Sequence, residues 1–176
     1  MDKFFTGLGI SLIIFGSFLV FQRNNPNRIA FAKNEVLEDI NINSKISIPS
    51  RIVINSLNIN LPIVSSKIKN GKWEVVSDGV SYLSDSPIAG QKGNSIMYGH
   101  NWSNLLGKLI NIKIGDEINI KYEDESVKKF KVILIQEVKP SDTSILNNTD
   151  DSRITLYTCS GFLDSKRFVV VAVLKN

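Results

Sequence analysis

An uninterrupted apolar run near the N-terminus is the strongest hydrophobic pattern in the chain. Residues 4–21, FFTGLGISLIIFGSFLVF, carry no charge, and Thr6, Ser11 and Ser17 are their only hydroxyl-bearing side chains. As a helix rising about 1.5 Å per residue, this run measures roughly 27 Å, close to the hydrocarbon thickness of a bilayer. A buried core helix normally keeps a polar stripe. We therefore predict a transmembrane helix.

A cleaved signal peptide is the alternative to a retained anchor. Ala30-Phe31-Ala32 has the small-x-small form of a cleavage site, but it ends eleven residues beyond the apolar run, which favours retention. Lys3 and the amino group precede the run, whereas Arg23 and Arg28 follow it. The flanking positive charges therefore leave the orientation in the membrane open.

After the apolar run, the residue pattern changes twice. Residues 22–45 are rich in Asn, carry scattered charges and contain Pro26, which is typical of a stalk. From Ile46 onward, short β-rich runs alternate with turn residues. We predict a signal-anchor at residues 1–21, a stalk at residues 22–45 and one folded domain at residues 46–176.

The folded domain has the pattern of a compact all-β barrel or sandwich. Residues 118–122 alternate apolar and polar side chains, as a half-buried strand does, whereas residues 168–174 are apolar on both faces and fit the middle of a sheet. Residues 102–110 are the best internal helix candidate, with Trp102 and three leucines on one face. The expected strands lie near residues 46–54, 59–65, 73–76, 94–99, 117–122, 127–138, 154–158 and 168–174.

The composition limits the number of domains and the kinds of binding site that this chain can contain. A chain of 176 residues with 43% hydrophobic and 22% charged residues has room for one globular domain plus an appendage. Its net charge of +4 comes without a concentrated basic face, so a nucleic-acid partner is not expected. Cys159 is the only cysteine in the sequence and His100 the only histidine. These counts exclude an internal disulfide, a thiolate metal cluster and a His-rich metal site.

An acidic run and two tryptophans are weaker candidates for binding. Glu123-Asp124-Glu125 lies between two expected strands, where a solvated hairpin turn is favoured over a calcium site. Trp73 and Trp102 are expected to be core or groove-wall side chains rather than a sugar-stacking platform. No cofactor is expected.

Cys159 and His100 each lie where an apolar strand ends. Cys159 follows residues 154–158, ITLYT, and precedes a Ser-Gly turn, so its thiol is expected to face a cleft bounded by loops. His100 follows residues 96–99 and precedes the helix candidate. The alternatives are a small buried thiol and a structural or surface histidine. Together, the two residues supply a nucleophile and a proton acceptor.

Arg167 lies eight residues after Cys159, at the start of the last expected strand. If these two strands are neighbours, the guanidinium and the thiol meet at the same end of the barrel. A permanent cation there would favour the thiolate and stabilise a negatively charged tetrahedral intermediate. A solvated arginine at the edge of the sheet is the alternative.

These segments resemble the sortase family of cysteine transpeptidases. Thr155-Leu156-Tyr157-Thr158-Cys159 matches that family's TLxTC motif, residues 93–100 (GNSIMYGH) match the strand that carries its histidine, and residues 167–170 (RFVV) match its arginine strand. Weaker matches occur at residues 46–49, 61–63, 115–116 and 138–140. The resemblance covers residues 46–176 in the family's order.

The resemblance implies an eight-stranded sortase-like β-barrel with one or two short helices, an N-terminal transmembrane signal-anchor and an extracytoplasmic catalytic domain at the cell membrane. It implies that Cys159 attacks the Thr–Gly bond of an LPxTG-like sorting signal and forms a thioacyl enzyme. His100 would protonate the leaving amine and deprotonate the incoming one, and Arg167 would orient the substrate and stabilise the oxyanion. The acceptor would be an amine of a cell-wall precursor or of a pilin-like subunit.

Substrate contacts are expected from Thr158, Tyr98 and Asn101, which lie near the cysteine and the histidine in sequence. The loop between Cys159 and Arg167 is short for the family and helps to form the substrate groove, so the sorting motif is left open. The single-domain layout resembles the smaller sortase classes and shows no class-defining insertion.

Three alternatives share some of these features. A cysteine hydrolase would use the same nucleophile and pass the acyl group to water. A catalytically silent, membrane-tethered binding module would have no chemical reason to keep Cys159, His100 and Arg167 together. An L,D-transpeptidase would be expected to have glycine just before the cysteine, where this chain has Thr158.

Overall fold

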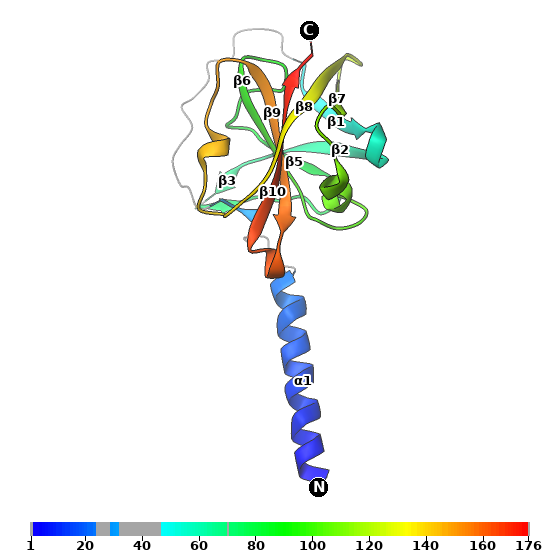
Figure 1. The fold of residues 1–176 in the computed structure, drawn as a ribbon, viewed down its shortest axis with the longest axis vertical. Helices are drawn as coiled ribbons and strands as arrows, with labels where there is room; N and C mark the ends of the chain where they lie inside the picture. The colour runs from blue at the N-terminus through cyan, green and yellow to red at the C-terminus, as the bar shows by residue number, and fades with distance from the viewer. Residues whose placement is uncertain (1, 24–28, 32–46, 70, 176) are drawn as a thin grey trace.

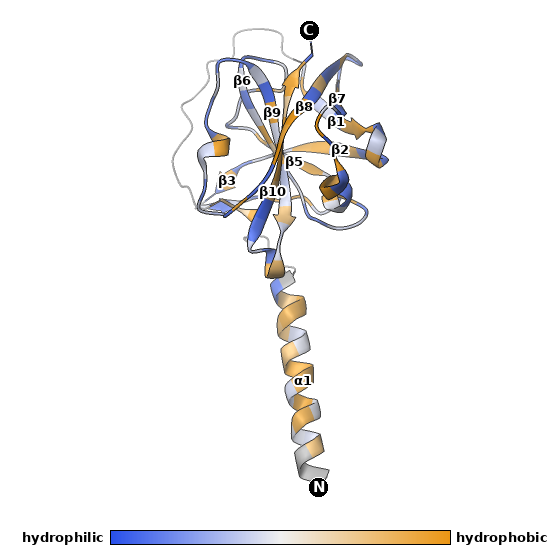
Figure 2. Cartoon of the chain, viewed as in Figure 1, coloured by the Kyte–Doolittle hydropathy of each residue, from blue (hydrophilic) through white to orange (hydrophobic). Residues whose placement is uncertain are grey.

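The apolar N-terminal run is helical in the computed structural model, which describes residues 2–23, 29–31, 47–69 and 71–175. Helix α1 (Asp2–Arg23) projects from one end of a β-rich body (Figure 1), and most of its length is coloured as hydrophobic in Figure 2. Its window Phe5–Gln22 has a mean hydropathy of 1.8 and is 0% buried against protein. By length and composition α1 can cross a membrane, and a signal sequence has the same properties.

Eight strands of the described residues close into a β-barrel in the order β1-β2-β5-β6-β9-β10-β8-β7. β2 pairs with β5, and β6 with β9, in parallel, and the other neighbouring strands are antiparallel. The strands are β1 (Pro49–Ile54), β2 (Ile59–Ser66), β5 (Val80–Leu83), β6 (Gly93–Tyr98), β7 (Glu117–Tyr122), β8 (Val127–Val138), β9 (Ser152–Ser160) and β10 (Lys166–Leu174).

The prediction of a barrel strand at residues 73–76 was wrong. Residues 73–76 do not enter the barrel, because Trp73 belongs to a small hairpin of β3 (Ile68–Lys69) and β4 (Lys72–Trp73). The barrel instead contains β5, in which every residue is buried. A short strand that is buried on both faces shows no alternation of apolar and polar residues, so the sequence pattern did not mark it.

The predicted internal helix is shorter and tighter than expected. Residues 106–111 form the 3-10 helix η3 (Leu106–Asn111), and the leucines expected on its inner face are buried. The Gly107 N–H donates to the Trp102 carbonyl oxygen over 2.9 Å, and a Cβ at Gly107 would lie 2.6 Å from the Asn101 carbonyl oxygen. This tight turn replaces the start of the expected α-helix. The other short helices described are η2 (Asn55–Leu57), η4 (Ser144–Leu146) and η5 (Phe162–Asp164).

Strands β6, β9 and β10 divide their side chains between two apolar clusters. Leu156 of β9 points into the barrel and joins its aliphatic interior. Tyr157 and Cys159 point the other way and join a second cluster on the outer face of these strands. The hairpin β3–β4, η4 and the segment Ile29–Phe31 cover that outer cluster. Burial on both faces explains the continuous apolar run of β10.

Candidate active site

Cys159 lies on β9, one residue before the strand ends. Its Cα partner on the antiparallel neighbour β10 is Arg167, so the register sets the two residues side by side at one end of the barrel. Directly opposed residues in a sheet point to the same face, and here that face is the outer one. Cys159 is 7% exposed and Arg167 2%. The arginine is therefore buried, and it is not the solvated edge residue that the sequence left as an alternative.

His100 follows β6, the other neighbour of β9. The two strands run parallel with Tyr98 opposite Tyr157, and the Gly99 N–H donates to the Tyr157 carbonyl oxygen over 3.3 Å. His100 follows Tyr98 by two residues, just as Cys159 follows Tyr157, so both lie at the same end of this parallel pair. The sheet order β6-β9-β10 therefore brings the histidine, the cysteine and the arginine to one end of three adjacent strands.

The imidazole of His100 is half-buried and stacks on the indole of Trp102, with ring centroids 4.4 Å apart and an interplanar angle of 7°. Burial lowers the pKa of His100 from its ordinary value, because removal from water disfavours the charged imidazolium, and the carboxylate of Asp164 partly opposes this shift. The neutral imidazole is the form that accepts a proton from a thiol. The environment of His100 favours that form.

The guanidinium of Arg167 is bound by backbone carbonyl groups. Its Nη1 donates to the carbonyl oxygens of Asp164 and Lys166, each over 3.0 Å. Its Nε donates to the carbonyl oxygen of Ile29 over 3.0 Å, and its Nη2 to that of Ala30 over 2.9 Å. Ile29 and Ala30 belong to the segment expected to be a stalk, so part of that segment lies against the candidate site.

Thr158 and Asn101, both predicted to contact substrate, make hydrogen bonds within the protein. The Thr158 hydroxyl is buried and donates to the Gly99 carbonyl oxygen over 2.8 Å, which ties β9 to the residue before His100. The Asn101 side chain is exposed and donates to the Asp164 carboxylate over 3.3 Å. These bonds position the neighbours of Cys159 and His100, and direct contact with a substrate stays a prediction for both residues.

Tyr98, the third predicted substrate contact, lies within the outer cluster. Its ring stacks on Tyr157 with centroids 5.4 Å apart and an interplanar angle of 17°, and Trp73 packs against it edge-on with centroids 5.2 Å apart. The Tyr98 hydroxyl donates to the Glu74 carbonyl oxygen over 2.6 Å, which fastens the segment after β4 to the outer face of the barrel. Its contact with a substrate also stays a prediction.

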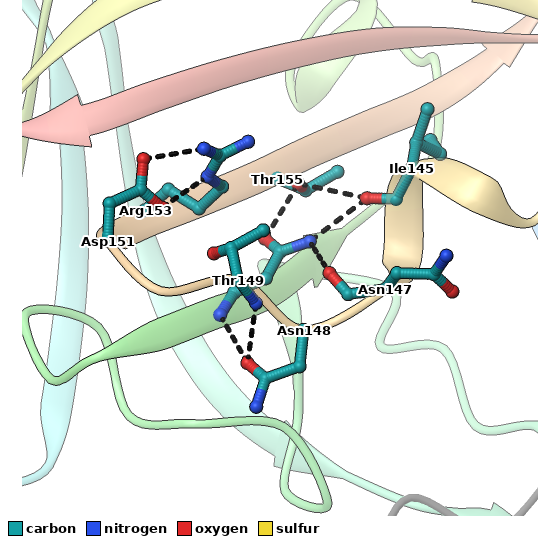
Figure 3. Close-up of polar contacts among 8 residues, drawn as sticks. Ile145, Asn147, Asn148, Thr149, Asp151, Arg153 and Thr155 are labelled. Atoms are coloured by element: carbon teal, nitrogen blue, oxygen red, sulfur yellow. Dashed lines mark hydrogen bonds and ion pairs between the residues drawn. The ribbon is translucent and has the colours of Figure 1, made fainter.

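The connection from β8 to β9 is fastened across the outer face by polar side chains (Figure 3). The Asn94 amide on β6 donates to the carbonyl oxygens of Ile145 and Asn147 over 2.9 and 3.1 Å. The Thr155 hydroxyl on β9 donates to the Asn94 side chain over 2.8 Å. A satisfied buried network of this kind rigidifies its surroundings. It holds η4, and with it Ile145, against the cluster that contains Cys159.

Sequence reasoning missed two residues of the site. Asp164 lies in the turn between β9 and β10, and it influences His100 only because that turn folds back toward the end of β6. Tyr157 occupies the variable position of the TLxTC match, yet its ring is fully buried beside the candidate nucleophile. Trp102, expected in the core or in a groove wall, is the stacking partner of the histidine. The alternation of side chains along a strand could have placed Tyr157 on the same face as Cys159, two residues later. No sequence signal marked Asp164.

The acidic run between β7 and β8 forms the hairpin turn that was favoured over a metal site. Asp124 accepts hydrogen bonds from the Ser126 N–H and hydroxyl over 3.0 and 2.6 Å, and Glu125 has a left-handed backbone with φ of 65°. In the part of the chain that the structure describes, no group of three or more His, Cys, Asp and Glu side chains is placed to hold a metal ion.

Comparisons with known proteins point to one family. Residues 52–175 match the family model described as a sortase domain. The chain is 30% identical over 128 residues to sortase A of Bacillus anthracis, which covers 70% of this chain and 58% of that protein. It is 28% identical over 136 residues to sortase A of Listeria monocytogenes, with 75% and 59% covered. The match thus spans less than two thirds of the length of these relatives.

Solved structures have the same fold. Sortase A from Corynebacterium diphtheriae has a TM-score of 0.63 and 26% identity, with 73% of this chain and 61% of that chain covered. Sortase A from Listeria monocytogenes has a TM-score of 0.61 and 26% identity, with 74% and 89% covered. Sortase C1 from Streptococcus agalactiae has a TM-score of 0.63 at 20% identity, with 72% and 68% covered, a similarity of fold alone. The predicted eight-stranded sortase-like barrel is confirmed.

Proposed function

This chain belongs to the sortase family, and from that premise we propose that it is a membrane-anchored transpeptidase acting on LPxTG-like sorting signals. The observation that carries the proposal is the placement of Cys159 beside Arg167 in the register of β9 and β10, with His100 directly after the parallel neighbour β6. A thiol, an imidazole and a guanidinium at one end of three adjacent strands supply a nucleophile, a proton carrier and a partner for an oxyanion.

In the acylation step, the Sγ atom of Cys159 attacks the carbonyl carbon of the Thr–Gly bond while His100 accepts the thiol proton. The Arg167 guanidinium stabilises the negative charge that develops on the carbonyl oxygen. When the tetrahedral intermediate collapses, the C–N bond breaks and His100 returns the proton to the leaving amine. The acyl group remains on Cys159 as a thioester.

In the second step, an amine attacks the thioester carbonyl and His100 accepts the amine proton. The C–S bond breaks, an amide bond forms, and His100 returns the proton to the sulfur of Cys159. Membership of the family supports a sorting signal as the acyl donor and a cell-wall precursor or pilin-like subunit as the amine. Burial disfavours the imidazolium form of His100 and so lowers the population of the thiolate–imidazolium pair. Activity should peak between the two apparent pKa values of the pair.

Helix α1 supports a single-pass anchor, with residues 1–21 in the membrane, residues 22–45 as the stalk and residues 46–176 as an extracytoplasmic catalytic domain. The helix has the length and hydropathy needed to cross a bilayer. Sorting signals and cell-wall acceptors are met on the outer side of the cell membrane, so the proposed activity requires this topology.

A transpeptidation assay on the full chain in detergent micelles tests the proposal. The protein is incubated with an LPxTG-type peptide library and triglycine, and the products are identified by mass spectrometry. The wild type should give triglycine-linked product and a thioacyl adduct. Cys159→Ala removes the nucleophile and should reduce product formation by at least about a thousandfold, while circular dichroism checks that the variant is folded.

The outcomes separate the alternatives. Product linked to triglycine from the wild type alone supports a transpeptidase that works through Cys159, and the peptide that reacts names the motif. Cleavage without ligation means that water is the acceptor, which favours the cysteine hydrolase. A folded wild type that gives neither cleavage nor an adduct with any peptide of the library contradicts the proposed activity and favours the binding module.

A further inference from the structure

The turn between β9 and β10 exposes two consecutive apolar side chains. Phe162 is 85% exposed and Leu163 49%. In the part of the chain that the structure describes, no other large apolar side chain is as exposed as Phe162, and this comparison includes the side chains of α1. Single exposed apolar residues are common on protein surfaces, whereas contiguous ones mark interaction sites. The turn is therefore a candidate contact surface for an apolar partner.

The backbone of this turn has an unfavourable shape that hydrogen bonds to the rest of the domain maintain. Leu163 and Asp164 have left-handed backbones with φ of 51° and 58°, a conformation that is costly for most residues other than glycine. Arg167 donates to the Asp164 carbonyl oxygen over 3.0 Å, and Asn101 donates to the Asp164 carboxylate over 3.3 Å. These bonds fix the turn, yet they leave Phe162 in solvent. The exposed tip thus stands on a fixed support.

The turn lies at the end of the body from which α1 projects. It is the orange-red segment at the lower end of the body in Figure 1. Arg167, which binds the turn, also donates to the carbonyl oxygen of Ile29 over 3.0 Å. Ile29 follows Arg23, the last residue of α1, by six residues, so their Cα atoms are at most about 23 Å apart. Because the apolar window of α1 ends at Gln22, a membrane that contains this window has its surface near the turn.

The charged side chains around the turn are compensated. Lys166 pairs with Glu137 over 3.0 Å, and the Asp164 carboxylate faces Asn101 and His100. A partner recognised by charge would instead need an excess of one sign at this surface. The boundary between lipid headgroups and acyl chains takes up apolar side chains such as those of phenylalanine and leucine. The chemistry of the turn fits that boundary.

We propose that Phe162 and Leu163 form a second membrane contact, which inserts into the lipid surface beside α1. The turn connects Cys159 to Arg167, so its contact with lipid fixes the distance of the thiol from the membrane and the direction that the active-site end faces. A single helical anchor leaves the domain free to swing on its linker, and a second contact removes that freedom. The inference rests on the membrane location of α1 in the proposed function, but not on transpeptidation.

A spin label measures the depth of the turn in a bilayer. The full chain with Cys159→Ala has no cysteine, so a nitroxide attached to Phe162→Cys reports that position alone. In phosphatidylcholine nanodiscs, its collisions with oxygen, which concentrates in lipid, are compared with its collisions with a water-soluble nickel chelate. The label should lie about 5–10 Å below the lipid surface.

A second substitution tests whether the apolar pair, rather than the label, drives insertion. Leu163→Asp in the labelled chain should return the label to water, because a carboxylate is costly to remove from water. Aspartate tolerates the left-handed backbone of this position, so the shape of the turn is kept. Immersion that survives Leu163→Asp would show that the label inserts by itself, and it would overturn the proposal.

Two further label positions serve as controls. Val127 is 47% exposed and begins β8, whose last residue, Val138, pairs with Arg167 at the active-site end. Val127 is therefore roughly 35 Å from that end, and a label on Val127→Cys should stay in water. Leu12 lies within the apolar window of α1, so a label on Leu12→Cys should lie deep in the bilayer.

The outcomes keep the turn and the anchor apart. Immersed labels at Phe162 and Leu12, with the Val127 label in water, support the second contact whether or not any LPxTG-type peptide is cleaved. A Phe162 label in water beside an immersed Leu12 label would overturn the turn contact and keep the anchor. A Leu12 label in water would overturn both. Few collisions of the Phe162 label with either reagent would mean that protein, such as a second copy of this chain, covers the turn, and would also overturn the proposal.

Discussion

The interior of the barrel and the outer face of β6, β9 and β10 are both buried, yet they are built differently. The interior contains mostly aliphatic side chains from strands all round the barrel, such as Ile120, Leu156 and Val170. The outer face combines aromatic rings with Cys159, and non-barrel segments cover it. A closed ring of strands exposes its interior only by unfolding, whereas a short hairpin or loop that covers a face can move away from it. The difference implies that the interior supports stability and the outer face supports activity.

Leu156→Ala tests the interior side of this comparison and has the largest expected effect. Leu156 is fully buried inside the barrel, and the cavity left by the substitution should lower the free energy of unfolding by about 2–5 kcal/mol. Chemical denaturation measures it. Leu134→Ala is the matched control, because Leu134 is 41% exposed, and its effect should be much smaller. Equal losses from both variants would contradict the assignment of stability to the interior.

Arg167→Lys tests the outer face. Lysine keeps the positive charge but loses the planar fork that reaches several carbonyl oxygens. We expect kcat/KM for an LPxTG-type peptide to fall by roughly 10²–10³-fold, the usual effect of removing a partner of the oxyanion. The melting temperature should fall less than in Leu156→Ala. A kcat/KM equal to that of the wild type would remove Arg167 from the catalytic residues.

Trp73→Ala tests the hairpin β3–β4 that covers the outer face. The indole is buried and packs edge-on against Tyr98 and Tyr157, so its loss should loosen the hairpin over the cluster that contains Cys159. Iodoacetamide should then alkylate the thiol faster than in the wild type, on the order of tenfold, and intact mass measures the rate because the sequence has one cysteine. An alkylation rate equal to that of the wild type would show that the hairpin does not limit access to the thiol.

Asp164→Asn has the smallest expected effect on activity. It removes the negative charge of Asp164, which acts on His100 at the edge of the outer face. The Asp164 carboxylate raises the pKa of His100 against the larger lowering by burial, so its removal should lower the pKa further. The branch of the pH–rate profile that requires the imidazolium should then shift to lower pH. An NMR titration measures the change directly, since His100 is the only histidine in the sequence.

The control for this titration is Asp150→Asn. Asp150 pairs with Lys92 and lies before the opposite end of β9, so its loss should leave the His100 pKa unchanged. An unchanged or raised pKa in Asp164→Asn would show that the carboxylate does not act on the imidazole.

Most of the fold and three residues of the candidate site could be predicted from local patterns. The apolar run of residues 4–21 predicted α1, and β-rich runs bounded by turn residues predicted strands β7 and β8 with their observed bounds. β5 was missed because four residues buried on both faces give no periodic signal. The turn around Gly107 was taken for part of an α-helix because its leucines have helical spacing.

The sequence by itself determined which residue types are available for chemistry and which strands carry them. One thiol, one imidazole and an arginine at strand ends, within motifs that resemble a known family, follow from order along the chain. Only the tertiary structure decided what surrounds them. The contact of Ile29 with Arg167 joins residues 138 positions apart, and the influence of Asp164 on His100 depends on how one turn folds back. Such contacts depend on the closure of the barrel, because it brings distant segments to one face, and no local periodicity records that closure.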